Sequence, residues 1–159
     1  MAQKLSVDVG ILELEINDNG VLRFNASDFN VYQRFLALVK ELPEMEKEYE
    51  AAAQNGGGEA DKEGREMEMA GEALDKVREV DRRVKSRLSD VFGPENDFDR
   101  LLGGVNVMAF GRNGERVISN LLNALQPYME AGIKQHMNEA AAEAVAQAKQ
   151  NRAKRRGKQ

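Results

Sequence analysis

The chain has 159 residues, a formal net charge of −4, 31% charged residues, no Cys, no Trp and a single His. The lack of Cys excludes disulfides, zinc–thiolate sites and thiol nucleophiles, and one His excludes a pair of His metal ligands within one chain. Leu, Ile, Val and Phe together supply 37 residues, 23% of the chain, just above the ~20% below which chains rarely fold. We therefore expect one domain with a small core and long solvated helices.

Residues 5–25 predict a short β-hairpin. Apolar and polar residues alternate at 5–9, at 12–16 and at 21–24, which is the period of half-buried strands. The run Asn-Asp-Asn-Gly at 17–20 predicts a tight turn, because Asn and Gly tolerate positive φ. A hairpin alone is marginal in water, so we expect it to lie on a helix.

The next segment predicts a helix from Ser27, the expected N-cap, to about Ala53. Pro43 lacks an amide proton and is expected to kink or restart this helix. Residues 55–58, Asn-Gly-Gly-Gly, predict a flexible joint. The apolar stripe of the helix is led by three aromatic residues, which we expect to pack on the hairpin: Phe29, Tyr32 and Phe35.

A second helix is predicted over residues 60–91, where apolar residues recur with heptad spacing. Joined to the first helix through the glycine joint, it predicts an antiparallel helix pair, with self-association of the chain as the rival interpretation. The stripe is either part of the chain's own core or a surface that shields the apolar stripe of a partner. For the second case the candidate partner-binding residues are Met67, Leu74, Val77, Val84 and Leu88.

The remainder of the chain predicts a short helix within 95–104, an ambiguous segment at 105–113, and a helix from Gly114 that Pro127 interrupts. An alanine-rich stretch follows, so the expected fold class is α+β, mostly α, with a single mostly helical domain over 1–148. Residues 149–159 are expected to form a frayed or disordered tail. Its candidate binding residues are the bases Arg152, Lys154, Arg155, Arg156 and Lys158.

Charge is distributed unevenly along the chain. The last eleven residues carry +6 and no acid, whereas residues 1–148 carry a net charge of −10. A basic tail on an acidic body predicts attraction to acidic surfaces or a tail that folds back on its own body. The alternative is a solubilising helix end, since bases at a C-terminus also suit the helix dipole.

Sequence motifs of catalysis are missing from the chain. It contains no phosphate-binding loop ending in Gly-Lys-Ser/Thr, no Gly-x-Ser-x-Gly and no His-Glu-x-x-His. His136 is expected to be an ordinary helical histidine, and the many carboxylates to lie on solvated helix faces. The sequence therefore predicts no enzyme activity, no cofactor and no metal. No apolar run reaches the ~18–20 residues of a membrane span, and no signal core opens the chain, so cytoplasmic residence is expected.

The segment from Gly111 to Gly114 resembles the Gly-x-x-Gly loop of a KH domain, which clamps a nucleic-acid backbone. A KH fold also needs strands on both sides of this unit, and none is predicted there. With the basic tail, the loop supports an alternative function as a small nucleic-acid-binding regulator. The tail has no interleaved aromatic residues for base stacking, so its attraction to phosphate would be nonspecific and weakened by salt.

The order of the elements and two short phrases carry a further resemblance. After the strand-rich start and the aromatic helix come an acidic helix, the phrase VFGPENDFDRLLGG at 91–104, and a last helix ending in NRAKRRGKQ. This layout resembles the small tail assembly chaperones of long-tailed phages and prophages of Gram-positive bacteria. The resemblance implies a non-enzymatic protein of the host cytoplasm that keeps the tape-measure protein soluble and recruits tail-tube subunits.

Overall fold

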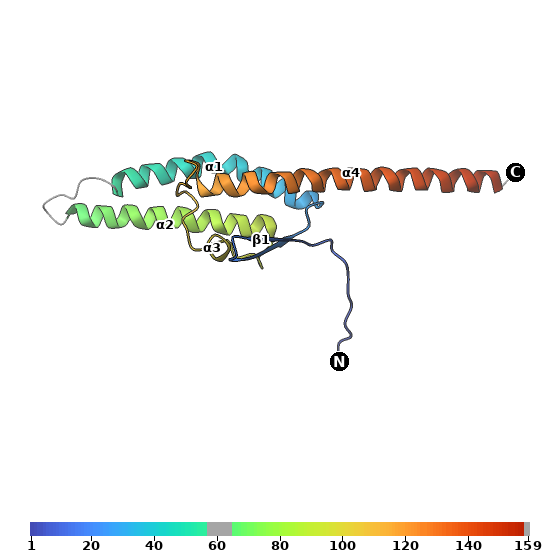
Figure 1. The fold of residues 1–159 in the computed structure, drawn as a ribbon, viewed down its shortest axis with the longest axis horizontal. Coiled ribbons are helices and arrows are strands. Elements are labelled where there is room, and N and C mark those ends of the chain that lie inside the picture. Colours follow the sequence, from blue (N-terminus) through green and yellow to red (C-terminus); the bar gives the residue numbers. More distant parts are fainter. Residues whose placement is uncertain (57–64, 158–159) are drawn as a thin grey trace.

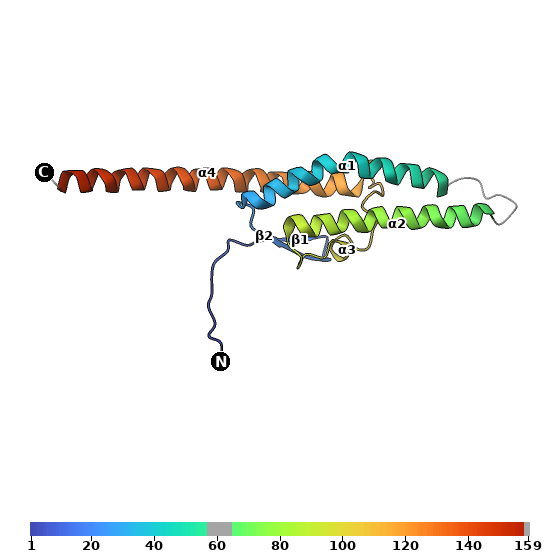
Figure 2. The same ribbon diagram turned by 180° about the vertical axis from the view of Figure 1, so that it is seen from behind.

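The computed structural model describes residues 1–56 and 65–157, with side chains for 1–55 and 70–157. Two strands, β1 (Leu12–Ile16) and β2 (Gly20–Phe24), precede the helices α1 (Phe29–Gly56), α2 (Arg65–Phe92), α3 (Phe98–Leu101) and α4 (Val117–Gly157). α1 and α2 lie side by side, the hairpin and α3 lie against the C-terminal end of α2, and α4 extends far beyond the other elements (Figure 1; Figure 2). The expected fold class, α+β and mostly α with a hairpin packed on helices, is confirmed.

The core forms where the hairpin meets the ends of α1 and α2. Phe24 of β2 contacts Phe92 edge-on at 4.9 Å between ring centroids, and Phe35 of α1 approaches the same ring at 6.4 Å. Leu22 and Leu38 are fully buried in this cluster. Ion pairs fix α1 and α2 antiparallel, with Arg87 bonded to Glu41 and Arg83 bonded to Glu48 nearer the other end.

The hairpin is shorter than the sequence predicted. β1 pairs with β2 from Leu12–Phe24 to Ile16–Gly20, whereas residues 5–9 have no strand structure and are exposed. The turn is centred on Asn17 and Asp18, whose φ angles are 48° and 61°, one residue pair before the expected Asn-Gly. Asn and Asp both tolerate the left-handed region, so this run offered two turn positions and the pairing of the flanking apolar residues selected one.

Asn96 fastens the hairpin to the helices. Its side chain, in a residue only 1% exposed, accepts a hydrogen bond from Arg23 N–H and donates to the carbonyls of Arg23 and Phe92 at 2.9–3.0 Å. The side-chain amide of Asn96 therefore makes with Arg23 the two hydrogen bonds that a residue of a neighbouring strand would make with β2. This contact explains why a two-stranded sheet is held firmly beside α2.

Two predictions about helix boundaries were wrong. Asp28, rather than Ser27, caps α1, because the Asp28 carboxylate accepts the backbone N–H of Asn30 at 2.9 Å. Pro43 and Pro127 lie inside α1 and α4, which continue through them, so the expected restart at Pro43 and interruption at Pro127 are wrong, while a kink at Pro43 stays a prediction. Both prolines are exposed, so each helix loses one hydrogen bond on a side that water can reach.

The ambiguous segment 105–113 is neither a strand nor a helix but a chain of turns with a buried centre. Val107 and Met108 are fully buried, and the N–H of Ile118 bonds to the carbonyl of Val107. A single bridge between Phe110 and Arg116 closes the loop. α4 therefore begins at Val117, three residues later than expected.

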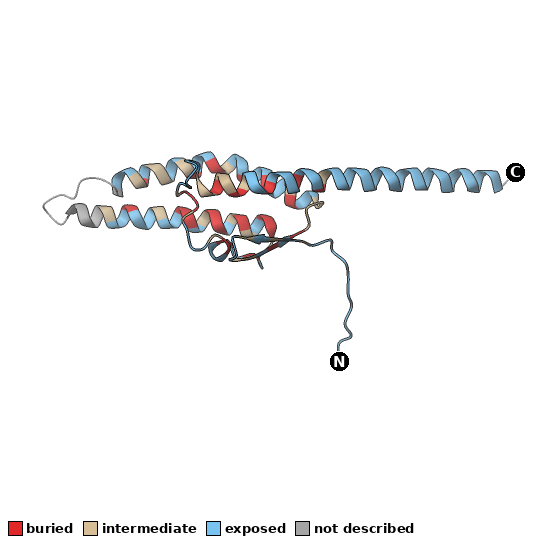
Figure 3. Ribbon diagram, in the orientation of Figure 1, coloured by how far each residue is buried: buried red, intermediate tan, exposed pale blue. Residues whose placement is uncertain are grey.

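The expected disorder of the basic tail was wrong for the residues described. α4 continues to Gly157, and every residue from 134 to 157 is exposed (Figure 3). Ala, Gln, Lys and Arg are all strong helix formers, and bases in the last turn suit the helix dipole, so the helix persists through the tail. Asn55 and Gly56 of the predicted flexible joint are helical residues of α1, so the joint does not begin at 55. Residues 57–58 of the joint, and Lys158, lie outside the described residues.

Candidate functional site

The predicted partner-binding stripe of α2 divides between core and surface. Val84 and Leu88 are 0% exposed in the chain's own core, so they are corrected from partner-binding residues to core residues. Val77 is half-buried and Leu74 is 57% exposed. The side chain of Met67 lies outside the described part of the structure. The accessible part of the predicted stripe is therefore Leu74 and Val77.

These two residues line an open groove of about 640 Å³ between α2 and the segment that follows it, here called the α2 groove. Its other lining residues are Arg78, Asp81, Arg82, Lys85, Ser86 and Ser89 of α2, and Asp97, Phe98, Asp99, Gly104 and Asn106. Apolar side chains at one end thus adjoin three bases and three carboxylates. A groove of this kind suits an amphipathic helix or extended peptide whose charged residues flank an apolar stripe.

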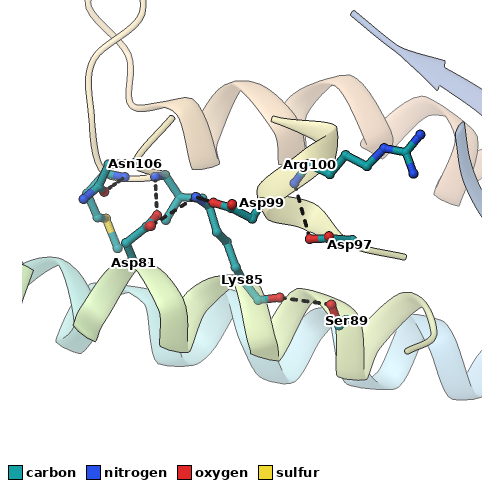
Figure 4. A network of polar contacts seen from close by, with 9 residues as sticks. Asp81, Lys85, Ser89, Asp97, Asp99, Arg100 and Asn106 are labelled. Carbon is teal, nitrogen blue, oxygen red and sulfur yellow. Dashed lines mark hydrogen bonds and ion pairs between the residues drawn. The ribbon is translucent and has the colours of Figure 1, made fainter. Parts of the chain in front are cut away.

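A buried lysine, Lys85, connects the two sides of the α2 groove through hydrogen bonds (Figure 4). Lys85 is 6% exposed and its Nζ donates to Asp81 at 3.0 Å and to Asp99 at 2.6 Å. Asp81 also accepts the N–H of Val107 at 2.8 Å. The hydrogen bond from Lys85, and its charge, lower the pKa of Asp99. This network ties α2 to α3 and to the loop before α4, so it gives the groove a fixed shape.

A second groove, which the sequence did not indicate, lies between α1 and the first half of α4. This α1–α4 groove has a volume of about 570 Å³ and is lined by Leu36 and Val39, each 41% exposed, and by Leu122. The charged residues of its lining are three glutamates, Glu46, Glu115 and Glu130. Leu36 and Val39 lie within the predicted first helix, whereas Leu122 lies in the last helix, so no local sequence pattern joins the two sides of this groove.

One face of α4 continues from this groove to the end of the helix. We call it the α4 stripe. It consists of Ser119, Leu122, Gln126, Glu130, Ile133, Met137, Ala141, Ala144, Ala148, Asn151 and Arg155. The steps of three and four average 3.6 residues, the period of a straight α-helix, so the residues stay on one side. The α4 arm, residues 137–157, carries the end of this stripe from Met137 to Arg155, where every residue is exposed, and is about 30 Å long.

The basic residues and the Gly111–Gly114 loop do not form one site. The bases Arg152, Lys154, Arg155 and Arg156 lie near the end of α4, and the loop precedes its start, about 60 Å away along the helix. Within the loop, Gly111 N–H donates to the carbonyl of Glu115 and Gly114 N–H to that of Gly111. These amides are occupied by the turn itself, so they differ from the free amides that clamp a phosphate.

The aromatic residues of α1 have separate roles. Phe35 packs on the hairpin core as expected, and Tyr32 packs against its margin. Phe29 instead stacks on His136 of α4 at 4.0 Å, and Nδ1 of His136 lies 3.1 Å from the carbonyl of Ser27. His136 thus marks the last contact of α4 with the body of the chain before the arm begins.

Among residues 1–55 and 70–157 there is no group of three or more His, Asp or Glu placed to hold a metal ion. Over the described helices, no stretch combines the length and apolar character needed to cross a bilayer. Comparisons with protein-family models, with curated proteins and with solved structures found no match. The two grooves and the α4 arm are the accessible surfaces of the described residues that could bind a partner.

Proposed function

We propose that this chain is a non-enzymatic tail assembly chaperone that binds the tape-measure protein and tail-tube subunits during tail morphogenesis. The proposal joins the resemblance in sequence layout to one structural observation. That observation is the α2 groove, in which exposed Leu74 and half-buried Val77 adjoin charged residues of both signs. A helix of the tape-measure protein would place its apolar stripe on Leu74 and Val77 and its charges against the flanking bases and carboxylates.

The size of the apolar part fits a contact that forms and is later released. Leu74 and Val77 offer a small apolar area, and surface ion pairs beside them add little affinity each. Several such chains along one long partner would hold it by many weak contacts, which can be displaced stepwise by tail-tube subunits. The acidic body of each chain would keep the coated partner soluble.

Co-expression with the tape-measure protein encoded in the same genome tests the proposal. We expect the tape-measure protein to stay soluble and to co-purify with this chain at high salt. Substitution of Leu74→Glu together with Val77→Glu should abolish co-purification, because a carboxylate would be desolvated against the partner's apolar stripe. Val21→Glu is the matched control, since Val21 is 44% exposed on β2 and lies outside the groove.

Two results would count against a chaperone. One is a native chain that leaves the tape-measure protein insoluble. The other is salt-sensitive retention on DNA that disappears when residues 149–159 are deleted, which would favour a nucleic-acid-binding regulator. Gene order gives an independent check, because the proposal expects a long helical tape-measure gene and a tail-tube gene beside this one.

A further inference from the structure

The α4 arm is a helix that the rest of the chain does not cover. Every residue of the arm is exposed, with Met137 at 56% and Val145 at 55% (Figure 3). With 21 residues the arm is longer than the ~12–15 residues below which isolated helices are marginal, and its alanines favour helix, so it stays helical without packing on the rest of the chain. Along the α4 stripe the arm presents Met137, three alanines and then bases at its end, so this accessible face can bind along another helix.

The α4 stripe is complementary to itself when a second copy is reversed. Its steps of three and four residues are nearly the same in both directions from Met137. Laid antiparallel with Met137 opposite Met137, the stripe of one copy meets the stripe of the other, and Ile133 faces Ala141. In the same register Gln126 faces Ala148 and Glu130 faces Ala144, so large side chains meet small ones on either side of the central Met137 pair.

Charge is complementary in the same arrangement. The register carries the basic end of one arm, with Arg152 and Arg155, over the α1–α4 groove of the other copy. The charged lining of that groove is acidic, with Glu46, Glu115 and Glu130. A two-fold axis produces this contact twice, once at each end of the overlap.

We propose that two copies of this chain pair antiparallel through the α4 stripe, with each arm lying in the α1–α4 groove of the other copy. The arm covers the exposed Leu36 and Val39 of its partner. Length, register and charge are all matched within one chain, which is why the occupant is a second copy. The α2 groove is a different surface, so this inference does not depend on the proposed function.

A single-cysteine experiment tests the register, because the native chain has no Cys. Met137→Cys places two thiols at the two-fold axis, within reach of a disulfide. Glu139→Cys is the control, because Glu139 is also exposed in the arm but lies on the opposite side of the helix. On mild oxidation of dilute protein we expect Met137→Cys to form a linked dimer at least tenfold faster. Equal rates for the two variants would overturn the proposal.

Charge reversal tests the same pairing without crosslinking. By sedimentation equilibrium, the double variant Arg152→Glu/Arg155→Glu should dimerise at least tenfold more weakly than the native chain, and so should Glu46→Arg/Glu115→Arg. Mixed in equal amounts, the two variants should form a dimer again. At one end of the mixed pair the acidic arm then meets the basic groove, and at the other end the native basic arm meets the native acidic groove. A mixture that stays monomeric, or single variants that dimerise like the native chain, would contradict the proposal. Restoration by mixing also shows that both variants are folded.

Discussion

The two halves of α4 are one continuous helix with two different kinds of support. From Val117 to His136 the helix buries Ile118, Leu121 and Leu125 in the core. From Met137 to Gly157 every residue is exposed and the sequence is rich in alanine and bases. The first half is helical because tertiary packing requires it, and the second because its residues favour helix. Burial therefore marks where the packed body of the chain ends and where the exposed arm begins.

The largest expected effect is at Gly132, where the packed half of α4 lies closest to the body. A Cβ at this position would lie 2.0 Å from the carbonyl oxygen of Ala26, so Gly132→Ala must separate the helix from the loop. We expect it to lower the free energy of unfolding by about 3 kcal/mol, measured by urea denaturation of dilute protein.

Gly71→Ala is the matched control for Gly132→Ala. Gly71 lies within α2, and a Cβ there meets nothing within 4 Å. Alanine favours helix over glycine, so this variant should be more stable by about 0.5–1 kcal/mol. If both substitutions stabilise the chain, Gly132 does not pack closely against Ala26, which would contradict this account of α4.

A second comparison contrasts two asparagines, one in the body and one in the arm. Asn96→Ala removes the partner of the Arg23 N–H and carbonyl and should cost about 2–3 kcal/mol of unfolding free energy. Asn138→Ala, at an exposed position of the arm, should change it by less than about 0.5 kcal/mol. Thermal melts of both variants check this, and equal losses would show that the arm is packed after all.

Removal of the arm tests directly whether it contributes to the stability of the packed body. Deleting residues 138–159 should change the free energy of unfolding by less than about 1 kcal/mol in dilute solution, because exposed residues contribute little to the core. The far-ultraviolet circular dichroism should lose the helical signal of the arm. A loss of cooperative unfolding in the truncated chain would contradict the division of α4 into two halves.

The smallest expected effect concerns pH. Lys85 lowers the pKa of Asp99 below its ordinary value of 3.8, so the pair stabilises the fold above about pH 4, and this contribution is lost as the pH falls through the lowered pKa. Asp99 is 66% exposed, so water screens the pair and the effect is small. Asp99→Asn should therefore be slightly less stable than the native chain at pH 6 and equal to it near pH 2. Urea titrations at both values test this, and a constant difference would count against the ion pair.

Much of the fold could be predicted from local patterns. The alternation at 12–16 and 21–24 predicted the hairpin, and the helical spacing after Asp28 and before Phe92 predicted α1 and α2. The short helix expected within 95–104 is α3, and Gly103 and Gly104 after it have positive φ. These features follow from properties of neighbouring residues, which sequence periodicity reports directly.

Features that depend on residues far apart could not be predicted in this way. The heptad pattern of α2 does not distinguish core from surface, so Val84 and Leu88 were interpreted together with Leu74, although only Leu74 is exposed. The α1–α4 groove joins Leu36 to Leu122, and no local pattern links them. The alanine-rich end of the chain has few large apolar side chains, so little burial was expected there, and its residues are indeed exposed within the chain. Composition alone did not reveal that some of these alanines continue the α4 stripe.

Amide hydrogen exchange across the α4 arm, measured on the full native chain at rising protein concentration, tests the central claim most directly. If the arm is a surface that another copy covers, residues 137–157 should exchange rapidly in dilute solution and become protected as concentration rises, while Ile118–Met129 stays protected throughout. Exchange in the arm that is the same at every concentration would contradict the account.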